Sequence, residues 1–201
     1  MLDRLVRPLI DPPLAAAARA LARAGVRADA VTLLGGAVGV GSAFAVAAGR
    51  FGLALLLVAL CRILDGVDGA LARHTRPTEF GGYLDAICDF VFYAALPLGF
   101  AFADPSRNAL PAAVLLASFL GTAASFLAFA AIAARRGLAS AAQGQKAFYY
   151  LGGLAEGTET IAVFVAMCIW PQAFPGLALG FAALCAVTVV GRVATAWRLL
   201  R

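Results

Sequence analysis

The stretch ALPAAVLLASFLGTAASFLAFAAIAA, residues 109–134, decides the fold class of this chain. It contains no charged residue and is longer than the roughly 20 apolar residues that an α-helix needs to cross a bilayer. The whole chain shares this character, because 63% of its 201 residues are hydrophobic and only 13% are charged. One small core cannot bury so much apolar sequence, which excludes a soluble globular protein.

Five further apolar runs lie on either side of this stretch, separated by short breaks rich in charged residues or proline. The six runs cover roughly residues 29–49, 51–73, 82–104, 109–134, 147–170 and 174–197. Each run has the length of one transmembrane helix, and the breaks are too short for a soluble domain. We therefore predict an all-α integral membrane protein in which residues 29–201 form a six-transmembrane-helix bundle.

Residues 12–27, ahead of the first run, have the pattern of an amphipathic helix. Arg19, Arg23 and Arg27 recur every four residues and share one helical face, with Leu14 and Ala18 elsewhere on the helix. Such a helix lies in the membrane interface with its charged face toward the headgroups. The sequence therefore predicts residues 1–28 to be a cytoplasmic, interfacial segment.

The basic residues of the short loops predict the orientation. Most lie in the N-terminal segment, the second-to-third loop, the fourth-to-fifth loop and the tail: Arg4, Arg7, Arg19, Arg23, Arg27, Arg73, Arg76, Arg135, Arg136, Lys146, Arg198 and Arg201. The opposite loops contain only Arg50 and Arg107. Since Lys and Arg concentrate on the cytoplasmic side, both termini should be cytoplasmic. The net charge of +5 does not indicate nucleic acid, because the basic residues are dispersed without interleaved aromatics.

Four carboxylates lie in and near two adjacent predicted spans. Asp65 and Asp68 are three residues apart near the cytoplasmic end of the second span, and Asp85 and Asp89 are four apart near the start of the third. On helices each pair shares one face, and all four lie within about two turns of the same surface. Four facing carboxylates cannot all stay ionised without a cation, and we expect no cationic side chain among them. Oxygen ligands suit Mg²⁺ or Mn²⁺.

Small residues and one arginine accompany these acids. Gly66, Gly69, Gly81 and Gly82 flank the carboxylates, which predicts that a bulky ligand approaches the helix backbones closely. Arg73 offers a bidentate fork for phosphate. A divalent metal, carboxylates, small residues and an arginine together indicate a pyrophosphate site.

Residues 65–73, DGVDGALAR, and 81–89, GGYLDAICD, resemble the signature of the CDP-alcohol phosphotransferases. That signature reads D-x2-D-G-x2-A-R, a spacer, then G-x3-D-x3-D, and every fixed residue is present. The resemblance implies an enzyme that transfers a phosphatidyl group from a CDP-linked donor such as CDP-diacylglycerol to the hydroxyl of a polar alcohol and releases CMP. It further implies phospholipid biosynthesis, a bacterial-type inner membrane, a cytoplasmic active site and a homodimer.

The resemblance also implies roles for individual residues. Asp65, Asp68 and Asp85 would bind two Mg²⁺ or Mn²⁺ ions, and Asp89 would share a metal and act as the base that deprotonates the alcohol. The nucleotide and pyrophosphate would contact Asp68, Gly69, Ala72, Arg73, Gly81 and Thr32. Ala28 stands where the family's entry to the first span has proline.

The remaining polar residues of the spans are candidates for the acceptor site: Ser125, Lys146, Glu156, Glu159 and Arg192. Glu156, about nine residues into the fifth run, should lie roughly 14 Å deep if that run is one helix. Arg192 with basic rim residues would suit a phosphorylated acceptor, whereas the two glutamates would suit an amine or several hydroxyls. A third interpretation is that Arg62 and Arg192 only neutralise these glutamates.

Two non-enzymatic classes remain as alternatives. A transporter would show inverted repeats with broken helices, and the sequence shows neither. A lipid-binding or scaffold protein without activity would be expected to lose signature carboxylates, and none is lost.

Overall fold

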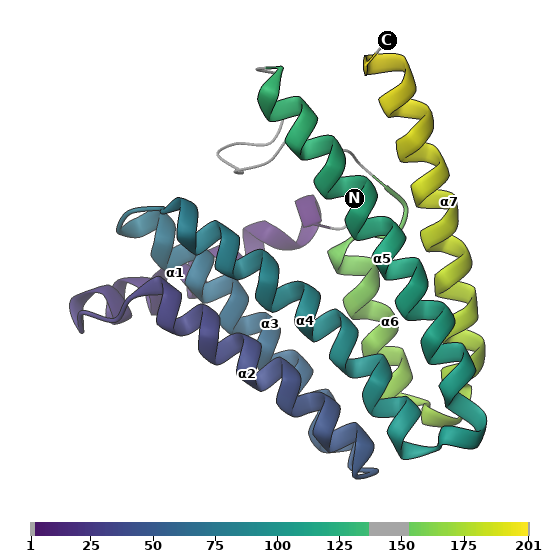
Figure 1. Cartoon of the computed structure of the whole chain (residues 1–201). Helices are drawn as coiled ribbons and strands as arrows, with labels where there is room; N and C mark the ends of the chain where they lie inside the picture. Colours follow the sequence, from purple (N-terminus) through teal and green to yellow (C-terminus); the bar gives the residue numbers. More distant parts are fainter. Residues whose placement is uncertain (1–2, 137–152, 201) are drawn as a thin grey trace.

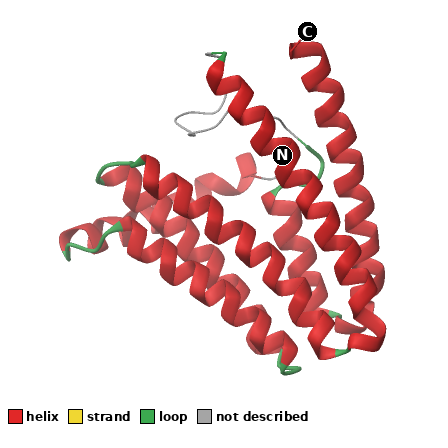
Figure 2. Cartoon of the chain, in the orientation of Figure 1, coloured by secondary structure: helices red, strands yellow, loops and turns green. Residues whose placement is uncertain are grey.

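The computed structural model describes residues 3–136 and 153–200, and the side chains from residue 12 onward. The described chain consists of helices joined by short turns (Figure 2). In order these are α1 (Asp3–Arg23), α2 (Ala28–Ala47), α3 (Phe51–His74), α4 (Glu79–Ala103), α5 (Pro105–Arg135), α6 (Gly157–Ile169), the 3₁₀ turn η2 (Pro171–Ala173) and α7 (Phe174–Leu200). The predicted all-α architecture is confirmed.

The helices pack as two groups joined through α3 and α4. Helix α2 packs against α3 and α4, α5 packs against both α4 and α7, and α6 packs against α3 (Figure 1). Buried phenylalanines join the groups, since Phe100 stacks on Phe174 with ring centroids 4.4 Å apart and Phe92 meets Phe164 edge to face at 5.6 Å. This aromatic core fixes the relative positions of the helices that carry the polar residues described below.

Local sequence signals set the helix boundaries. Gly49 ends α2 with a φ of 70°, a conformation that glycine adopts without strain. The Thr78 side chain caps α4 by accepting a hydrogen bond from the Gly81 N–H at 2.9 Å. Asp104 caps α5 in the same way, accepting from the Arg107 N–H at 3.2 Å. Helices α4 and α5 therefore start three and four residues before their predicted apolar runs.

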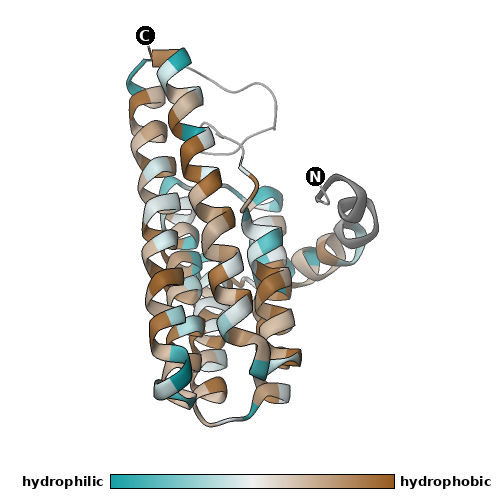
Figure 3. Ribbon diagram, turned by 90° about the vertical axis from the view of Figure 1, so that its right-hand side faces the viewer, coloured by the Kyte–Doolittle hydropathy of each residue, from teal (hydrophilic) through white to brown (hydrophobic). Residues whose placement is uncertain are grey.

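Several helices have the length and composition of membrane spans. Helices α2, α4 and α5, and the segment from η2 through α7, are long and apolar enough to cross a bilayer. Hydrophobic residues run along the helices (Figure 3), which leaves many large apolar side chains exposed to lipid. The 24-residue α3 has the length of a span but contains Arg62, Asp65, Asp68 and Arg73. The 13-residue α6 is short for a span, so the described residues do not establish the predicted count of six.

The prediction of one continuous helix over residues 147–170 is wrong. Residues 137–152 lie outside the described part of the chain, but residues 153–156 are described and are not helical. The Gly153 N–H donates to Glu156 Oε1 at 2.8 Å, a hydrogen bond within the segment itself. Glu156 is the N-cap residue of α6 and lies outside any helix, so the depth reckoned along a helix does not hold.

The N-terminal helix packs on the outside of α3. Helix α1 is longer than predicted at its amino end and stops at Arg23, before a turn at Gly25. Buried Ala18 packs in a cluster with Val67 and Leu71 of α3. A Cβ at Gly66 would come within 2.8 Å of Leu14 Cδ1, so Gly66 makes room for α1 and not for a ligand. The interfacial position of residues 1–28, and their separation from a domain 29–201, stay predictions.

Candidate active site

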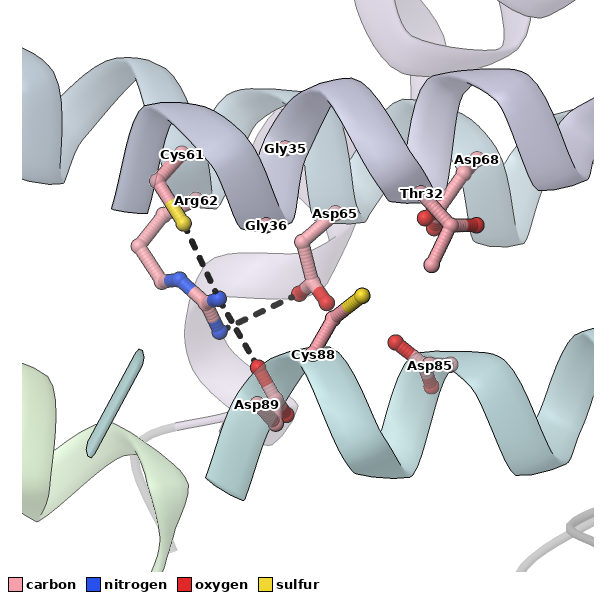
Figure 4. A pocket seen from close by; sticks show the side chains of 10 residues that line it. All are labelled: Thr32, Gly35, Gly36, Cys61, Arg62, Asp65, Asp68, Asp85, Cys88 and Asp89. Atoms are coloured by element: carbon pink, nitrogen blue, oxygen red, sulfur yellow. Dashed lines mark hydrogen bonds and ion pairs between the residues drawn. The ribbon is translucent and has the colours of Figure 1, made fainter. Parts of the chain in front are cut away.

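Three of the four predicted aspartates come together between α3 and α4, which both pack against α2. Asp65 and Asp68 of α3 and Asp85 of α4 each offer a carboxylate oxygen, and these oxygens lie within 4.8 Å of one another (Figure 4). Asp68 is the deepest, with 6% of its surface exposed. The short connection capped by Thr78 turns the chain back, which brings the end of α3 beside the start of α4. Three carboxylates this close repel one another and suit a hard divalent cation.

The fourth aspartate contacts a cation. Asp89 Oδ1 accepts a hydrogen bond from Arg62 Nη2 at 2.8 Å, and Arg62 Nη1 lies 3.5 Å from Asp65 Oδ2 (Figure 4). The expectation that no cationic side chain lies among the acids is therefore wrong. Arg62 is one turn before Asp65, and its long side chain reaches across to α4.

A large cavity of about 1110 Å³ borders the acid cluster. Asp68, Asp85 and Asp89 line it, while Asp65 lines a smaller adjoining pocket with Arg62 and Cys88. The residues predicted to contact the nucleotide and pyrophosphate all line the large cavity: Thr32, Asp68, Gly69, Ala72, Arg73 and Gly81. Arg73 folds over Gly69, where a Cβ would lie 3.2 Å from its Nη1. Of the glycines that were predicted to let a ligand approach, Gly69, Gly81 and Gly82 line this cavity and Gly66 does not.

The cavity continues past Asp89 to a second polar region formed by α5, α7 and the start of α6. Glu156, Thr160, Thr122 and Arg192 line this part. Arg192 is 7% exposed, its Nη1 donates to the Thr122 carbonyl oxygen at 2.9 Å, and its guanidinium lies 5.7 Å from the Phe126 ring centroid. The cavity therefore has one end beside the acid cluster and another beside a buried arginine.

The non-helical segment 153–156 is held against α7. Thr188 Oγ1 accepts hydrogen bonds from the Leu154 N–H at 3.1 Å and the Ala155 N–H at 2.9 Å. A Cβ at Gly153 would overlap the Thr188 side chain, so a residue larger than glycine cannot occupy this position without a shift. These contacts hold the segment that ends at Glu156, which lines the same cavity as Arg192.

The predicted acceptor residues fall into three groups. Glu156 and Arg192 line the cavity. Within the described residues, Ser125 and Glu159 are outside its lining, and Ser125 Oγ donates to the Thr122 carbonyl oxygen at 2.9 Å. Lys146 lies outside the described residues. Arg62 pairs with Asp65 and Asp89, so the idea that it serves to neutralise Glu156 or Glu159 is wrong.

Two residues of the site were missed by sequence reasoning. Arg62 was considered only as a residue that neutralises the glutamates, because its partner on α4 cannot be identified from spacing along one helix. Tyr93 lines the cavity one turn after Asp89, and a Cβ at Gly157 would lie 3.4 Å from its hydroxyl oxygen. The i,i+4 spacing from Asp89 is the signal that could have found Tyr93.

The arrangement defines a class: a helical membrane protein with a carboxylate cluster at one end of a large cavity. The chain belongs to the CDP-alcohol phosphatidyltransferase family, whose sequence model matches residues 26–197. It is similar to the inner membrane protein YnjF of Escherichia coli, with 47% identity over 193 residues that cover 96% of this chain and 94% of that protein. It is also similar to archaetidylinositol phosphate synthase of Pyrococcus horikoshii, with 28% identity over 116 residues, 57% of this chain and 62% of that one.

Solved structures of one enzyme share the fold. Phosphatidylinositol phosphate synthase of Mycobacterium tuberculosis with CDP-DAG bound aligns with a TM-score of 0.68 and 27% identity, over 92% of this chain and 93% of that one. The same enzyme in complex with manganese and citrate aligns with a TM-score of 0.74 and 25% identity, over 92% and 88%. This protein is therefore a multi-pass membrane protein with the fold of a family transferase.

Proposed function

We propose that this protein transfers a phosphatidyl group from CDP-diacylglycerol to the hydroxyl of a polar alcohol and releases CMP, in phospholipid biosynthesis. The observation that carries the proposal is the clustering of Asp65, Asp68 and Asp85 beside a cavity that continues past Asp89 to Arg192. A transfer reaction needs two substrates to meet, and a cavity that runs from the acid cluster past Asp89 to Arg192 provides that meeting place. The CDP-DAG complex of the M. tuberculosis synthase supports the choice of donor.

The acid cluster fits a pair of Mg²⁺ or Mn²⁺ ions. Its donor set is oxygen only, and carboxylates held this close to one another favour a bound divalent cation. Asp65, Asp68 and Asp85 would hold the ions, and Asp89 could share one of them. The ions would neutralise charge on the donor's pyrophosphate.

The chain's own residues would bind and orient the donor. Arg73 is placed over the cavity floor at Gly69, where its guanidinium can hold phosphate oxygens. Thr32, Ala72 and Gly81 line the same region and would contact the nucleotide. The diacylglycerol tails would remain in lipid beside the apolar helix faces.

Asp89 would act as the base for the acceptor. The acceptor's oxygen attacks the phosphorus that bears the diacylglycerol, its proton passes to an Asp89 carboxylate oxygen, and a new P–O bond forms. The bond from that phosphorus to the bridging pyrophosphate oxygen breaks, and CMP leaves with the electron pair. Asp89 borders the cavity between its two ends, where such a proton transfer is required.

The test is CMP release by purified protein from CDP-diacylglycerol with a panel of polar alcohols. We expect release to require an alcohol and a divalent ion, so EDTA should abolish it and Mg²⁺ or Mn²⁺ should restore it. Full turnover in chelator would contradict the metal assignment. No CMP release with any alcohol would favour the transporter or lipid-binding alternatives.

For the acceptor end, we predict that Glu156→Gln raises the acceptor KM by about tenfold, because a charged hydrogen bond to the substrate contributes roughly 1.5–3 kcal/mol. The donor KM should stay within about twofold, since Glu156 lies in the acceptor part of the cavity. Steady-state kinetics with each substrate varied would measure both values. Glu159→Gln is the matched control, because Glu159 lies three residues away and outside the described cavity lining. Equal effects of the two substitutions would contradict this assignment.

We also propose that the acid cluster opens to the cytoplasm, with both termini on that side, from the asymmetry of loop charges. Cysteines substituted at Arg50 and Arg107 should react with an impermeant thiol reagent added to intact cells, and a cysteine at Arg76 should not. The unsubstituted protein gives the background of its own four cysteines. Labelling of only the cysteine at position 76 would indicate the opposite orientation and contradict this proposal.

A further inference from the structure

Tyr93 brings a phenol hydroxyl into the large cavity one helical turn after Asp89 on α4. Residues four apart on a helix share one face, with about 5–6 Å between their Cβ atoms. The hydroxyl oxygen lies beside the first turn of α6, because a Cβ at Gly157 would be 3.4 Å from it. Tyr93 therefore borders the part of the cavity that leads from Asp89 to Glu156, the N-cap residue of α6.

Aromatic neighbours hold the ring of Tyr93 in place. Its centroid lies 5.7 Å from that of Phe92, 6.1 Å from that of Phe164 and 6.4 Å from that of Phe119. Phe92 and Phe164 are fully buried, so the ring cannot swing away without opening the close-packed core. The hydroxyl is thus presented to the cavity in a fixed position, which lowers the entropy cost of binding a partner.

The hydroxyl of Tyr93 has no protein partner within the part of the chain that the structure describes. No described group forms a hydrogen bond with it, and it is not one of the polar atoms that are buried there without one. It is therefore open to the cavity that Tyr93 lines. Because a tyrosine hydroxyl in apolar surroundings usually binds a polar group, a molecule in the cavity is the remaining source of that group.

The surroundings of Tyr93 limit the kind of group that its hydroxyl can bind. The three phenylalanines favour a neutral partner, since a charged group is costly in apolar surroundings without an opposite charge beside it. Asp89, the proposed base for the acceptor, is one helical turn away. Two hydrogen bonds of about 2.7–2.8 Å and the short O–C–C–O unit of a vicinal diol can bridge such a gap.

We propose that the Tyr93 hydroxyl binds a second, neutral hydroxyl of the acceptor, on the carbon next to the one that bears the reacting hydroxyl. This inference rests on the proposed function and specifies its acceptor as a vicinal diol. The competing explanation is that only water meets the Tyr93 hydroxyl and that the ring serves for packing. Phenylalanine at this position keeps the packing and removes only the hydroxyl, so it separates the two explanations.

The kinetic test compares Tyr93→Phe with the parent and with Tyr83→Phe, the same substitution at an exposed tyrosine of α4 outside the cavity lining. Propylene glycol and n-propanol serve as acceptors, since they differ only in the vicinal hydroxyl. We expect Tyr93→Phe to lower kcat/KM for propylene glycol by about 3–10-fold, the effect of one neutral hydrogen bond, and to change the value for n-propanol and the donor KM by less than about twofold. Tyr83→Phe should change all three values by less than about twofold. Equal losses for both alcohols, no loss with propylene glycol, or a loss confined to ethanolamine would overturn the proposal.

A second measurement needs no turnover and separates this inference from the proposed function. The purified chain is labelled with fluorotyrosine at its four tyrosines, and the fluorine NMR signal that is missing in Tyr93→Phe belongs to Tyr93. We expect propylene glycol to shift this signal in a saturable way, n-propanol to leave it in place, and the Tyr83 signal to respond to neither. If the parent released no CMP, the proposed function would fail, and a saturable shift with propylene glycol would still support the diol contact. No shift, or the same shift with both alcohols, would overturn the inference even in an active enzyme. Should Tyr93→Phe not fold, the signals of Tyr83→Phe, Tyr149→Phe and Tyr150→Phe assign the Tyr93 signal by elimination.

Discussion

Asp68→Asn is expected to reduce CMP release by about 10³-fold or more, the largest effect of any single substitution in this site. Asp68 is the most buried of the four aspartates and belongs both to the acid cluster and to the lining of the large cavity. Its loss would weaken metal binding and, because the metal would bind the donor's pyrophosphate, donor binding as well. A metal at a phosphoryl oxygen contributes several kcal/mol to transition-state stabilisation, and each 1.4 kcal/mol is tenfold in rate.

The measurements are kcat/KM for CDP-diacylglycerol and the affinity for Mn²⁺, both of which should fall. The thermal midpoint of the Asp68→Asn protein, measured in chelator, should equal or exceed that of the parent. Removing one of three mutually repelling carboxylates lowers the charge repulsion in the cluster. Asp104→Asn is a matched control, since Asp104 is an exposed carboxylate that caps α5 away from the site. Retained Mn²⁺ affinity in a folded Asp68→Asn protein would contradict the metal assignment.

Asp89→Asn is expected to lower kcat by about 10²–10⁴-fold, the usual range for loss of a general base. Much of the donor affinity should remain, because the three other aspartates form a carboxylate cluster without Asp89 and would still hold the metal. Single-turnover CMP release and direct donor binding would separate the two quantities. If donor binding disappears as completely as in Asp68→Asn, Asp89 is chiefly a metal ligand and the base lies elsewhere.

The spacing of the signature was sufficient to predict that Asp65, Asp68 and Asp85 meet, but not that Asp89 pairs with Arg62. Asp65, Asp68 and Asp85 recur at helical intervals on two helices joined by a short loop, so local geometry alone places them on facing sides. The apolar runs predicted most helices for the same reason, since length and hydropathy are local properties. The residues that the family signature assigned to the nucleotide and pyrophosphate also line one cavity.

Features that depend on distant side chains could not be predicted in this way. The non-helical segment 153–156 is stabilised by Thr188, more than thirty residues further along the chain. The length and hydropathy of an apolar run contain no information about such a contact. The role of Gly66 depends on Leu14 from another helix. The partner of Arg62 depended on which way a long side chain turns between two helices.

The segment 153–156 has a consequence for side reactions. Thr188 lies near the middle of α7, and it holds the non-helical segment at that level of the helix. Within a membrane, non-helical backbone is tolerated where it lines a water-filled cavity or is buried in protein. In the proposed reaction, water that enters the cavity at Glu156 would also reach the phosphorus that is attacked. Water has an O–H group that can attack in place of the alcohol's hydroxyl, and its attack would yield phosphatidic acid and CMP. The proposed enzyme can favour the alcohol over water only through contacts with the rest of the acceptor molecule. The rate of CMP release without any alcohol therefore measures how much hydrolysis this end of the cavity permits.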